Sequence, residues 1–173
     1  MSIGIVGYGS FGKLIHILLQ RFAPKMEVRV FSSRAEPDTK TFFSFEEVAQ
    51  SDAVVLCVPI HAFEEALQKV LPLLGPQSVL VDVATVKMHT VEILKRLAGG
   101  KQWIATHPMW GPESYEKKKG DVTGFRIVVT DHTLPPQRYE ALQAVLKGCG
   151  FDVVEMSAEK HDKHLAETLF LTH

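Results

Sequence analysis

Residues 3–12, Ile-Gly-Ile-Val-Gly-Tyr-Gly-Ser-Phe-Gly, decide the fold of this chain. They begin with a short apolar run that has the length of a buried parallel strand. Three glycines follow at G-x-G-x-x-G spacing, and behind them apolar residues recur at helical spacing from Phe11 to Phe22. The segment therefore predicts a strand, a glycine turn and a helix, in the order that a dinucleotide requires.

Each glycine of this turn has its own expected role. Gly7 permits the tight turn, Gly9 lets the backbone approach a pyrophosphate, and Gly12 lets the helix and the strand pack closely. The helix N-terminus adds free N–H groups and a partial positive charge, so Ser10 and Phe11 are expected to join the cofactor site. The alternative is a tight turn without a ligand, which the position between strand and helix disfavours.

The composition is that of one ordinary globular domain. The chain has 173 residues, 46% hydrophobic and 23% charged, and its formal net charge is -1. This balance gives no basic field for nucleic acid, and no apolar run is long enough to cross a bilayer. We also see no signal or transit peptide before the first strand. Cys57 and Cys149 lie far apart and are typical of buried thiols in a reducing compartment, so we expect a cytoplasmic protein.

The residues after a second predicted strand, Glu27–Phe31, bear on the cofactor. Proteins that bind NAD usually carry an acidic residue here to hold the ribose hydroxyls. This chain instead has two hydroxyls and a guanidinium, at Ser32, Ser33 and Arg34. A fixed fork of donors suits a 2′-phosphate, which favours NADP over NAD. A solvated arginine in a surface loop is the alternative, and the nearby Glu36 and Asp38 leave NAD open.

The remaining chain alternates predicted strands with predicted helices. Further strands are expected at Ala53–Val58, Val79–Val83, Trp103–Thr106, Phe125–Val129 and Phe151–Glu155, with a very short one at Phe42-Phe43. Helices are expected at Phe45–Gln50 with Ser44 as cap, at Phe63–Leu74, at Thr90–Leu97, and from Pro135-Pro136 to Gly148. The charged run Glu116–Lys119 is expected to be a flexible loop, or a lid over the site. This alternation predicts an α/β protein with a Rossmann-type, doubly wound, mostly parallel sheet.

Functional groups are expected where strands end at one edge of this sheet. A cofactor passes the loops that follow parallel strands, so Val58 and Pro59 are expected to line its nicotinamide side. Thr85 and Lys87 stand where a strand tip would face the site. His107 precedes a proline, which favours an extended conformation at the end of its strand. An imidazole there can exchange a proton with a substrate hydroxyl, and a histidine bonded to nearby backbone is an equally weighted alternative.

The C-terminal segment predicts a final helix. Ser157 suits its N-cap and Glu159 suits its first turn. One helical face carries a carboxylate, an imidazole and small or apolar residues, namely Asp162, Ala166, Leu169 and His173. This face suggests the wall of a site, whereas the alternative is a surface helix end with solvated histidines. His161 and His164 have no third ligand at a supporting spacing, so no metal site is expected.

Four stretches together resemble the prephenate/arogenate dehydrogenase family over the whole chain. They are Gly7–Gly12, residues 81–87 (Val-Asp-Val-Ala-Thr-Val-Lys), residues 106–114 (Thr-His-Pro-Met-Trp-Gly-Pro-Glu-Ser), and a helix from His161-Asp162 to Thr172-His173. The third stretch looks most like the plant-type arogenate dehydrogenases. It also argues against other nicotinamide enzymes with this fold, such as imine or keto-acid reductases. The resemblance implies an oxidative decarboxylation of arogenate, or of prephenate, in tyrosine biosynthesis, with a hydride passing to the nicotinamide.

The resemblance also implies roles for individual residues. His107 is the catalytic histidine, which accepts the ring-hydroxyl proton, and Thr85 takes the place of a serine that orients it. The residues implied in substrate binding are His173, Asp162, Gly111 and Ser114. Asp162 is a candidate for sensing the ammonium group of arogenate, although members that use prephenate also carry an aspartate there.

Members of this family continue into an all-helical domain that supplies a dimer interface and closes the pocket. We therefore expect residues 1–156 to form the dinucleotide-binding domain, and residues 157–173 the first helix of a truncated helical substrate and dimerisation domain. Apolar residues on that helix suggest a cover by another copy, as in a homodimer, or by another chain; they are Leu165, Leu169 and Phe170. The alternative to an enzyme is a non-catalytic NADP-binding module that needs a separate helical partner.

Overall fold

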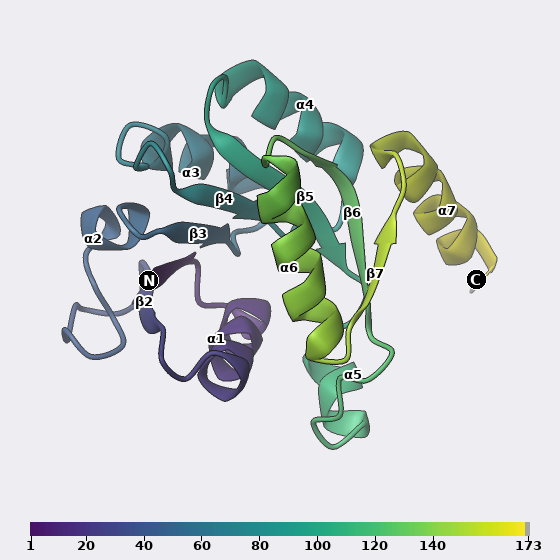
Figure 1. Ribbon diagram of the computed structural model, residues 1–173, viewed down its shortest axis with the longest axis horizontal. Helices are drawn as coiled ribbons and strands as arrows, with labels where there is room; N and C mark the ends of the chain where they lie inside the picture. Colours follow the sequence, from purple (N-terminus) through teal and green to yellow (C-terminus); the bar gives the residue numbers. More distant parts are fainter. Residues whose placement is uncertain (172–173) are drawn as a thin grey trace.

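A seven-stranded sheet in the order β2-β1-β3-β4-β5-β6-β7 runs through the molecule (Figure 1). The computed structural model describes residues 1–171, and their side chains as far as residue 168. The strands are β1 (Ser2–Val6), β2 (Glu27–Phe31), β3 (Ala53–Leu56), β4 (Val79–Asp82), β5 (Gln102–Pro108), β6 (Arg126–His132) and β7 (Asp152–Glu155). The helices are α1 (Ser10–Phe22), α2 (Phe45–Ala49), the 3-10 turn η1 (Ile60–Ala62), α3 (Phe63–Val70), α4 (Lys87–Leu97), α5 (Pro112–Lys117), α6 (Pro136–Gly148) and α7 (Ala158–Leu171). The predicted α/β fold with a Rossmann-type, mostly parallel sheet is confirmed.

The connections of this sheet create one edge at which several loops meet. Neighbouring strands are parallel, except β5 and β6, which are antiparallel. The chain runs from β1 through α1 to β2, and then crosses back to β3 on the other side of β1. This reversal places a switch point beyond the carboxyl ends of β1 and β3, where open α/β sheets bind ligands. The loops after β1, β3, β4 and β5 therefore lie at the same edge.

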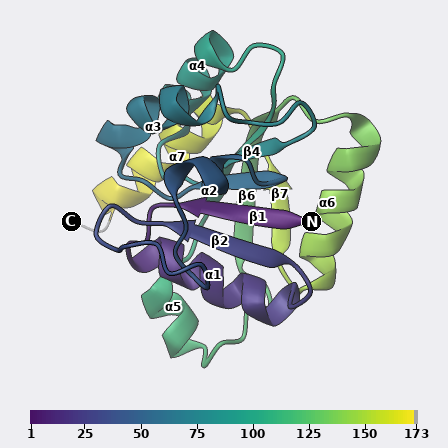
Figure 2. The same cartoon turned by 90° about the vertical axis from the view of Figure 1, so that its left-hand side faces the viewer.

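Helices cover both faces of the sheet. One face is buried by α2, α3 and α4, whose core includes Phe63, Leu67 and Leu94. The other face is covered by α1 and α6, and Leu14 and Leu18 of α1 belong to its core. Figure 2 shows α3 and α4 above the sheet and α1 and α5 below it. This doubly wound arrangement buries the central strands on both sides, which explains their continuous apolar sequences.

Pairing with β6 makes β5 longer than the predicted strand, which ended at Thr106. The pairing extends to His107 and Pro108, and the register shifts between Ala105 and Thr106. Such an irregularity re-aims the side chains that follow it, and it is common beside functional sites. The final residues of β5 are therefore fixed in the sheet instead of belonging to a loop.

Two helix starts show how local sequence sets the termini. The Ser44 hydroxyl accepts the Glu47 N–H at 3.2 Å, while the Glu47 carboxylate accepts the Ser44 N–H at 3.0 Å. This capping box confirms the predicted start of α2. In contrast, α1 begins after Gly9 with no side-chain cap and no acidic residue in its first turn. Its first N–H groups are therefore available to a ligand.

The prediction of a flexible loop at Glu116–Lys119 was wrong for its first half, which completes α5. Pro112 stands in the first turn of α5, where its fixed φ suits a helix. Tyr115 packs against the core that α1 and α6 share. Packing of this one aromatic residue stabilises a helix whose exposed charges suggest a loop.

The start of α4 is set by a residue far away in the sequence. The helix begins at Lys87, not at the predicted Thr90. The Asp162 carboxylate, which belongs to α7, accepts the backbone N–H groups of Lys87 and Met88 at 2.9 Å each. A carboxylate satisfies N–H groups that have no partner inside the helix. The cap thus also joins α7 to α4.

Candidate active site

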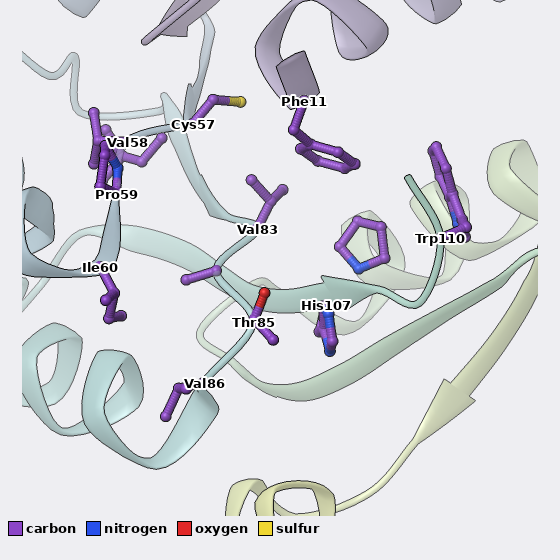
Figure 3. Close-up of a pocket in the computed structure, with 13 residues that line it drawn as sticks. Phe11, Cys57, Val58, Pro59, Ile60, Val83, Thr85, Val86, His107 and Trp110 are labelled. Carbon is purple, nitrogen blue, oxygen red and sulfur yellow. The ribbon is translucent and has the colours of Figure 1, made fainter. Parts of the chain in front are cut away.

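A pocket of about 420 Å³ opens at the carboxyl edge of the sheet (Figure 3). Its walls come from the first turn of α1, from the loops after β3 and β4, and from the end of β5. Most of the side chains that line it are apolar. Thr85 and His107 are the lining residues that carry a hydroxyl and an imidazole. The pocket therefore combines a mostly apolar lining with two side chains that can exchange or hydrogen-bond a proton.

The glycine turn beside the pocket fits a dinucleotide cofactor. Gly7 has a φ of 102°, and a Cβ there would overlap the Cys57 carbonyl oxygen. A Cβ on Gly12 would overlap the Gly7 carbonyl oxygen, so Gly12 permits the close packing of α1 on β1. A Cβ on Gly9 would meet no atom within 4 Å. The open space at Gly9, next to the uncapped N-terminus of α1, suits a pyrophosphate.

The residues predicted to bind the cofactor fall into two groups. Phe11, Val58 and Pro59 line the pocket (Figure 3). Ser10 is the first residue of α1 and is exposed. The other group, Ser32, Ser33 and Arg34, follows β2 outside the pocket lining. The two groups flank the switch point between β1 and β3, as the two ends of an extended cofactor would require.

The loop after β2 exposes hydrogen-bond donors, while the carboxylate of its Asp38 is hydrogen-bonded within the loop. The Ser32 hydroxyl accepts the Arg34 backbone N–H at 3.3 Å, and the side chains of Ser33 and Arg34 are exposed. The Asp38 carboxylate accepts the backbone N–H groups of residues 40–42. These hydrogen bonds hold the pKa of Asp38 below its usual range. The Asp38 carboxylate thus organises its own loop.

Two further lining residues differ in reactivity. Thr85 is exposed on the loop after β4, and its hydroxyl has no hydrogen-bond partner among the described residues. Its predicted role in orienting His107 stays a prediction. Burial raises the pKa of the Cys57 thiol to about 12, so the thiol stays protonated at neutral pH. Cys57 therefore lines the pocket but is not a nucleophile.

Lys87 does not face the site, contrary to the prediction from its position after β4. Its ammonium lies 2.6 Å from the Asp82 carboxylate, and both side chains are fully buried. The ammonium also donates to the Thr106 carbonyl oxygen at 2.6 Å, and the Thr106 hydroxyl donates to the Asp82 carbonyl at 2.7 Å. Burial lowers the pKa of Lys87, while Asp82 opposes that shift. This cluster ties the ends of β4 and β5 to α4, directly behind His107.

His107 is buried at the end of β5 and is hydrogen-bonded to a second histidine. The residue is 8% exposed, and its Nδ1 lies 2.8 Å from Nε2 of His161. The Nδ1 atom of His161 in turn lies 2.7 Å from an Asp162 carboxylate oxygen. The second nitrogen of His107, Nε2, has no hydrogen-bond partner among the described residues. A row of two imidazoles and a carboxylate therefore ends at the pocket.

The surroundings of His107 favour its neutral form. Burial is the largest cause, and the charges of His161 and Lys87 act in the same direction, so the pKa of His107 is lowered to about 4. Asp162 acts in the opposite direction. The imidazole is therefore uncharged at neutral pH and can accept a proton.

Asp162 is placed to remain ionised. Burial acts to raise its pKa, but hydrogen bonds from the Lys87 and Met88 N–H groups and from His161 outweigh burial and lower it. All three donors reach the same carboxylate, through both of its oxygens. The predicted role of Asp162 in sensing an ammonium group stays a prediction, and the structure adds a role as helix cap.

The remaining predicted substrate residues lie outside the pocket lining. Gly111 is the N-cap of α5 and Ser114 is exposed on that helix, whereas their neighbour Trp110 lines the pocket. The Trp110 ring stacks on Phe125, with ring centroids 5.3 Å apart. His173 lies outside the described residues. The substrate roles of Gly111, Ser114 and His173 stay predictions.

Sequence reasoning missed the role of His161. It treated this residue as half of an unsupported metal pair or as a solvated histidine, whereas the side chain is 2% exposed. Helical spacing grouped Asp162 with Ala166 and did not single out its neighbour. The His-Asp dipeptide after the last strand was the available signal, and its meaning depends on how α7 packs. Among the described residues there is no group of three metal-ligating side chains, and no helix there could span a membrane.

Comparisons with known proteins agree with this geometry. Residues 36–170 match the family model for the nucleotide-binding domain of prephenate dehydrogenase. The whole chain aligns with arogenate dehydrogenase 1, chloroplastic, from Arabidopsis thaliana at 28% identity, and covers 29% of that protein.

Two solved structures are similar in fold. Synechocystis arogenate dehydrogenase has a TM-score of 0.78 and 24% identity, over 96% of this chain and 63% of that one. Prephenate dehydrogenase from A. aeolicus, solved with hydroxyphenyl propionate and NAD+, has a TM-score of 0.77 and 24% identity, over 94% of this chain and 62% of that one. The chain thus spans less than two thirds of the length of each of these relatives.

Proposed function

This chain belongs to the prephenate dehydrogenase nucleotide-binding family, and from that premise we propose that it catalyses the NADP-dependent oxidative decarboxylation of arogenate, or of prephenate, in tyrosine biosynthesis. The observation that carries the proposal is a buried His107 at a pocket beside an uncapped glycine turn. Burial lowers the pKa of His107 to about 4, which favours its neutral form. The reaction removes a proton and a hydride from one ring position and carbon dioxide from another. It therefore needs a base and a hydride acceptor in one pocket.

The cofactor is assigned to the groups that surround the switch point. We propose that the turn at Gly9 and the first N–H groups of α1 hold its pyrophosphate. Phe11, Val58 and Pro59 bound the nicotinamide side of the pocket. When bound there, the nicotinamide supplies the hydride acceptor.

The preference for NADP rests on the loop after β2. Arg34 and Ser33 are exposed there, and Asp38 is already committed to its own loop. A guanidinium binds a phosphate by two parallel hydrogen bonds. The Arg34→Ala variant should weaken NADP binding about tenfold, or roughly 1.4 kcal/mol, in calorimetry. NAD affinity, measured alongside as the control, should stay within about twofold of wild type. An equal loss of affinity for both cofactors would show that Arg34 does not bind the 2′-phosphate.

His107 is proposed as the base for the ring hydroxyl. Its Nε2 atom has no partner among the described residues, and its Nδ1 is held by His161. A base with a pKa of about 4 is weak towards an ordinary alcohol. However, a hydroxyl becomes strongly acidic as its carbon loses a hydride, so a weak neutral base suffices at that stage. The low pKa also keeps His107 unprotonated across the physiological range.

The test compares arogenate and prephenate, each with NADP and with NAD, by following reduced cofactor in absorbance. The proposal predicts the fastest turnover with arogenate and NADP. Lack of turnover with all four pairs, in a protein that binds NADP in calorimetry, would contradict catalysis by this chain.

A second candidate function is a non-catalytic NADP-binding module that needs a separate helical partner. Exposed apolar side chains at the pocket favour this function: Ile60 and Val86 line the pocket, and Met88 follows two residues after Val86. A second copy of the chain is the other proposed cover, with Leu165 of α7 partly buried. Sedimentation separates the two possible covers of the pocket. A homodimer favours a second copy of this chain, and a monomer that binds NADP without turnover favours the non-catalytic module with a separate helical partner.

A further inference from the structure

The row formed by His107, His161 and Asp162 has a fixed hydrogen-bond direction. The Asp162 carboxylate accepts hydrogen bonds from the backbone N–H groups of Lys87 and Met88 at the start of α4. These hydrogen bonds lower its pKa and keep it ionised. An ionised carboxylate only accepts hydrogen bonds. At 2.7 Å, the Nδ1 atom of His161 must therefore carry the proton that it shares with Asp162.

The position of this proton determines which ring nitrogens of His161 and His107 carry the other protons. A neutral imidazole that donates from Nδ1 carries a lone pair on Nε2. Nε2 of His161 lies 2.8 Å from Nδ1 of His107, so Nδ1 of His107 must carry a proton and donate it. His107 is then left with a lone pair on Nε2, the nitrogen that has no partner among the described residues.

We propose that His161 and Asp162 are positioning residues that hold His107 in the tautomer whose Nε2 accepts the substrate hydroxyl proton. The inference rests on the proposed function for its substrate. In this step the O–H bond of the hydroxyl breaks and an Nε2–H bond forms on His107. The Nδ1 proton of His107 then moves to Nε2 of His161, so the positive charge comes to lie beside the Asp162 carboxylate. Return of that proton, and release of the Nε2 proton to water, restore the resting state.

The charges around the row suit this role. His161 and Asp162 face His107 from α7, Lys87 lies on α4, and Asp82 on β4 pairs with Lys87. The Lys87 charge disfavours an imidazolium at His107, whereas Asp162 lies in direct contact with His161. A positive charge is therefore better placed on His161 than on His107. The two rings also pack in a T shape, with their centroids 5.0 Å apart.

A merely structural role for His161 would hold α7 against α4 without fixing the tautomer. Nitrogen-15 NMR of the side-chain imidazoles separates the two roles, because protonated and unprotonated ring nitrogens have distinct chemical shifts and two-bond couplings. Spectra of the full 173-residue chain at slightly alkaline pH need neither cofactor nor turnover. The wild-type protein should show His107 with a protonated Nδ1 and an unprotonated Nε2. A protonated Nε2 on His107 would overturn the proposal.

Three variants complete the experiment. In His161→Gln, the side-chain amide oxygen can still accept the Nδ1 proton of His107, so this variant should keep the tautomer. His161→Leu removes the acceptor and should populate the Nε2-protonated tautomer. His164→Leu, at an exposed histidine on the same helix, is the matched control and should match wild type. An unchanged His107 tautomer in a folded His161→Leu protein would overturn the proposal, and the wild-type spectrum decides the matter if this variant fails to fold.

The kinetic prediction follows for an active protein. His161→Leu should lower kcat about 10- to 100-fold, less than the roughly 100- to 10,000-fold that the base itself contributes, because His107 stays in place and loses only its favoured tautomer. NADP affinity should stay within about twofold of wild type. His161→Gln should recover most of that loss. Its pH–rate profile should move because the glutamine at position 161 cannot take up the positive charge. Failure of the proposed function would appear as wild-type inactivity, and the NMR result would still stand or fall by itself.

Discussion

At the scale of single residues, the two glycines that flank the start of α1 face opposite surroundings. A Cβ on Gly12 would collide with the Gly7 carbonyl oxygen, whereas a Cβ on Gly9 points into open space. Gly12 is therefore required by the packing of the fold, whereas the space beside Gly9 is available to a ligand.

These surroundings predict different outcomes for two alanine substitutions. Gly12→Ala should lower the free energy of unfolding by about 1–3 kcal/mol, the usual cost of overpacking, in urea denaturation. Gly9→Ala should leave unfolding unchanged but weaken NADP binding about tenfold in calorimetry, because its methyl group occupies the space assigned to the pyrophosphate. Normal NADP affinity in Gly9→Ala would place the pyrophosphate elsewhere.

The neutral state of His107 predicts a pH dependence of stability. Its pKa lies near 4 in the folded protein and at 6.5 ordinarily, so between these values the unfolded chain binds the proton and the folded chain does not. The free energy of unfolding should therefore be fully retained above pH 6.5 and should fall as the pH drops towards about 4. Urea denaturation at several pH values measures this.

The matched variant for this measurement is His107→Asn, which cannot titrate. Its stability should change less with pH over the same interval than that of wild type. His16, whose pKa burial also lowers, remains in both proteins and contributes equally. Identical pH dependence in the two proteins would mean that His107 is protonated in the folded state as readily as in the unfolded chain.

At the scale of elements, the buried pair of Lys87 and Asp82 joins α4 to the ends of β4 and β5. Lys87→Met leaves a buried carboxylate without its partner and should lower the free energy of unfolding by about 3–5 kcal/mol. Adding Asp82→Asn removes that charge but keeps an acceptor for the Ala84 N–H, so the double variant should recover part of the loss. Equal destabilisation of the single and double variants in urea denaturation would show that packing dominates over charge.

Elements were predicted well where the cause is local, and less well where a distant segment decides. The capping box of Ser44 and Glu47 and the glycine turn after β1 are contained within a few residues. The start of α4 depends on Asp162, and the length of β5 depends on its pairing with β6. No periodicity within either segment carries that information.

At the scale of the whole molecule, the same division applies to the candidate site. His107 was singled out from the proline that follows it and from its place at a strand end. His161 gains its meaning only from the packing of α7, which brings it 2.8 Å from His107 across 54 residues of sequence. The resemblance to a family named His107 and Asp162 as site candidates, and the packing of α7 places His161 in hydrogen-bond contact with both of them.

The measurement that tests the central claim most directly is the rate of NADPH formation from arogenate by the wild-type protein and by His107→Asn, with NADP binding measured for both. The account predicts turnover by the wild type and a loss of about 100-fold or more in the variant, because general base catalysis contributes at least that much. NADP affinity should be similar in the two proteins. Equal rates in the two proteins would contradict the account, because His107 would then be a structural residue and the pocket would lack its base.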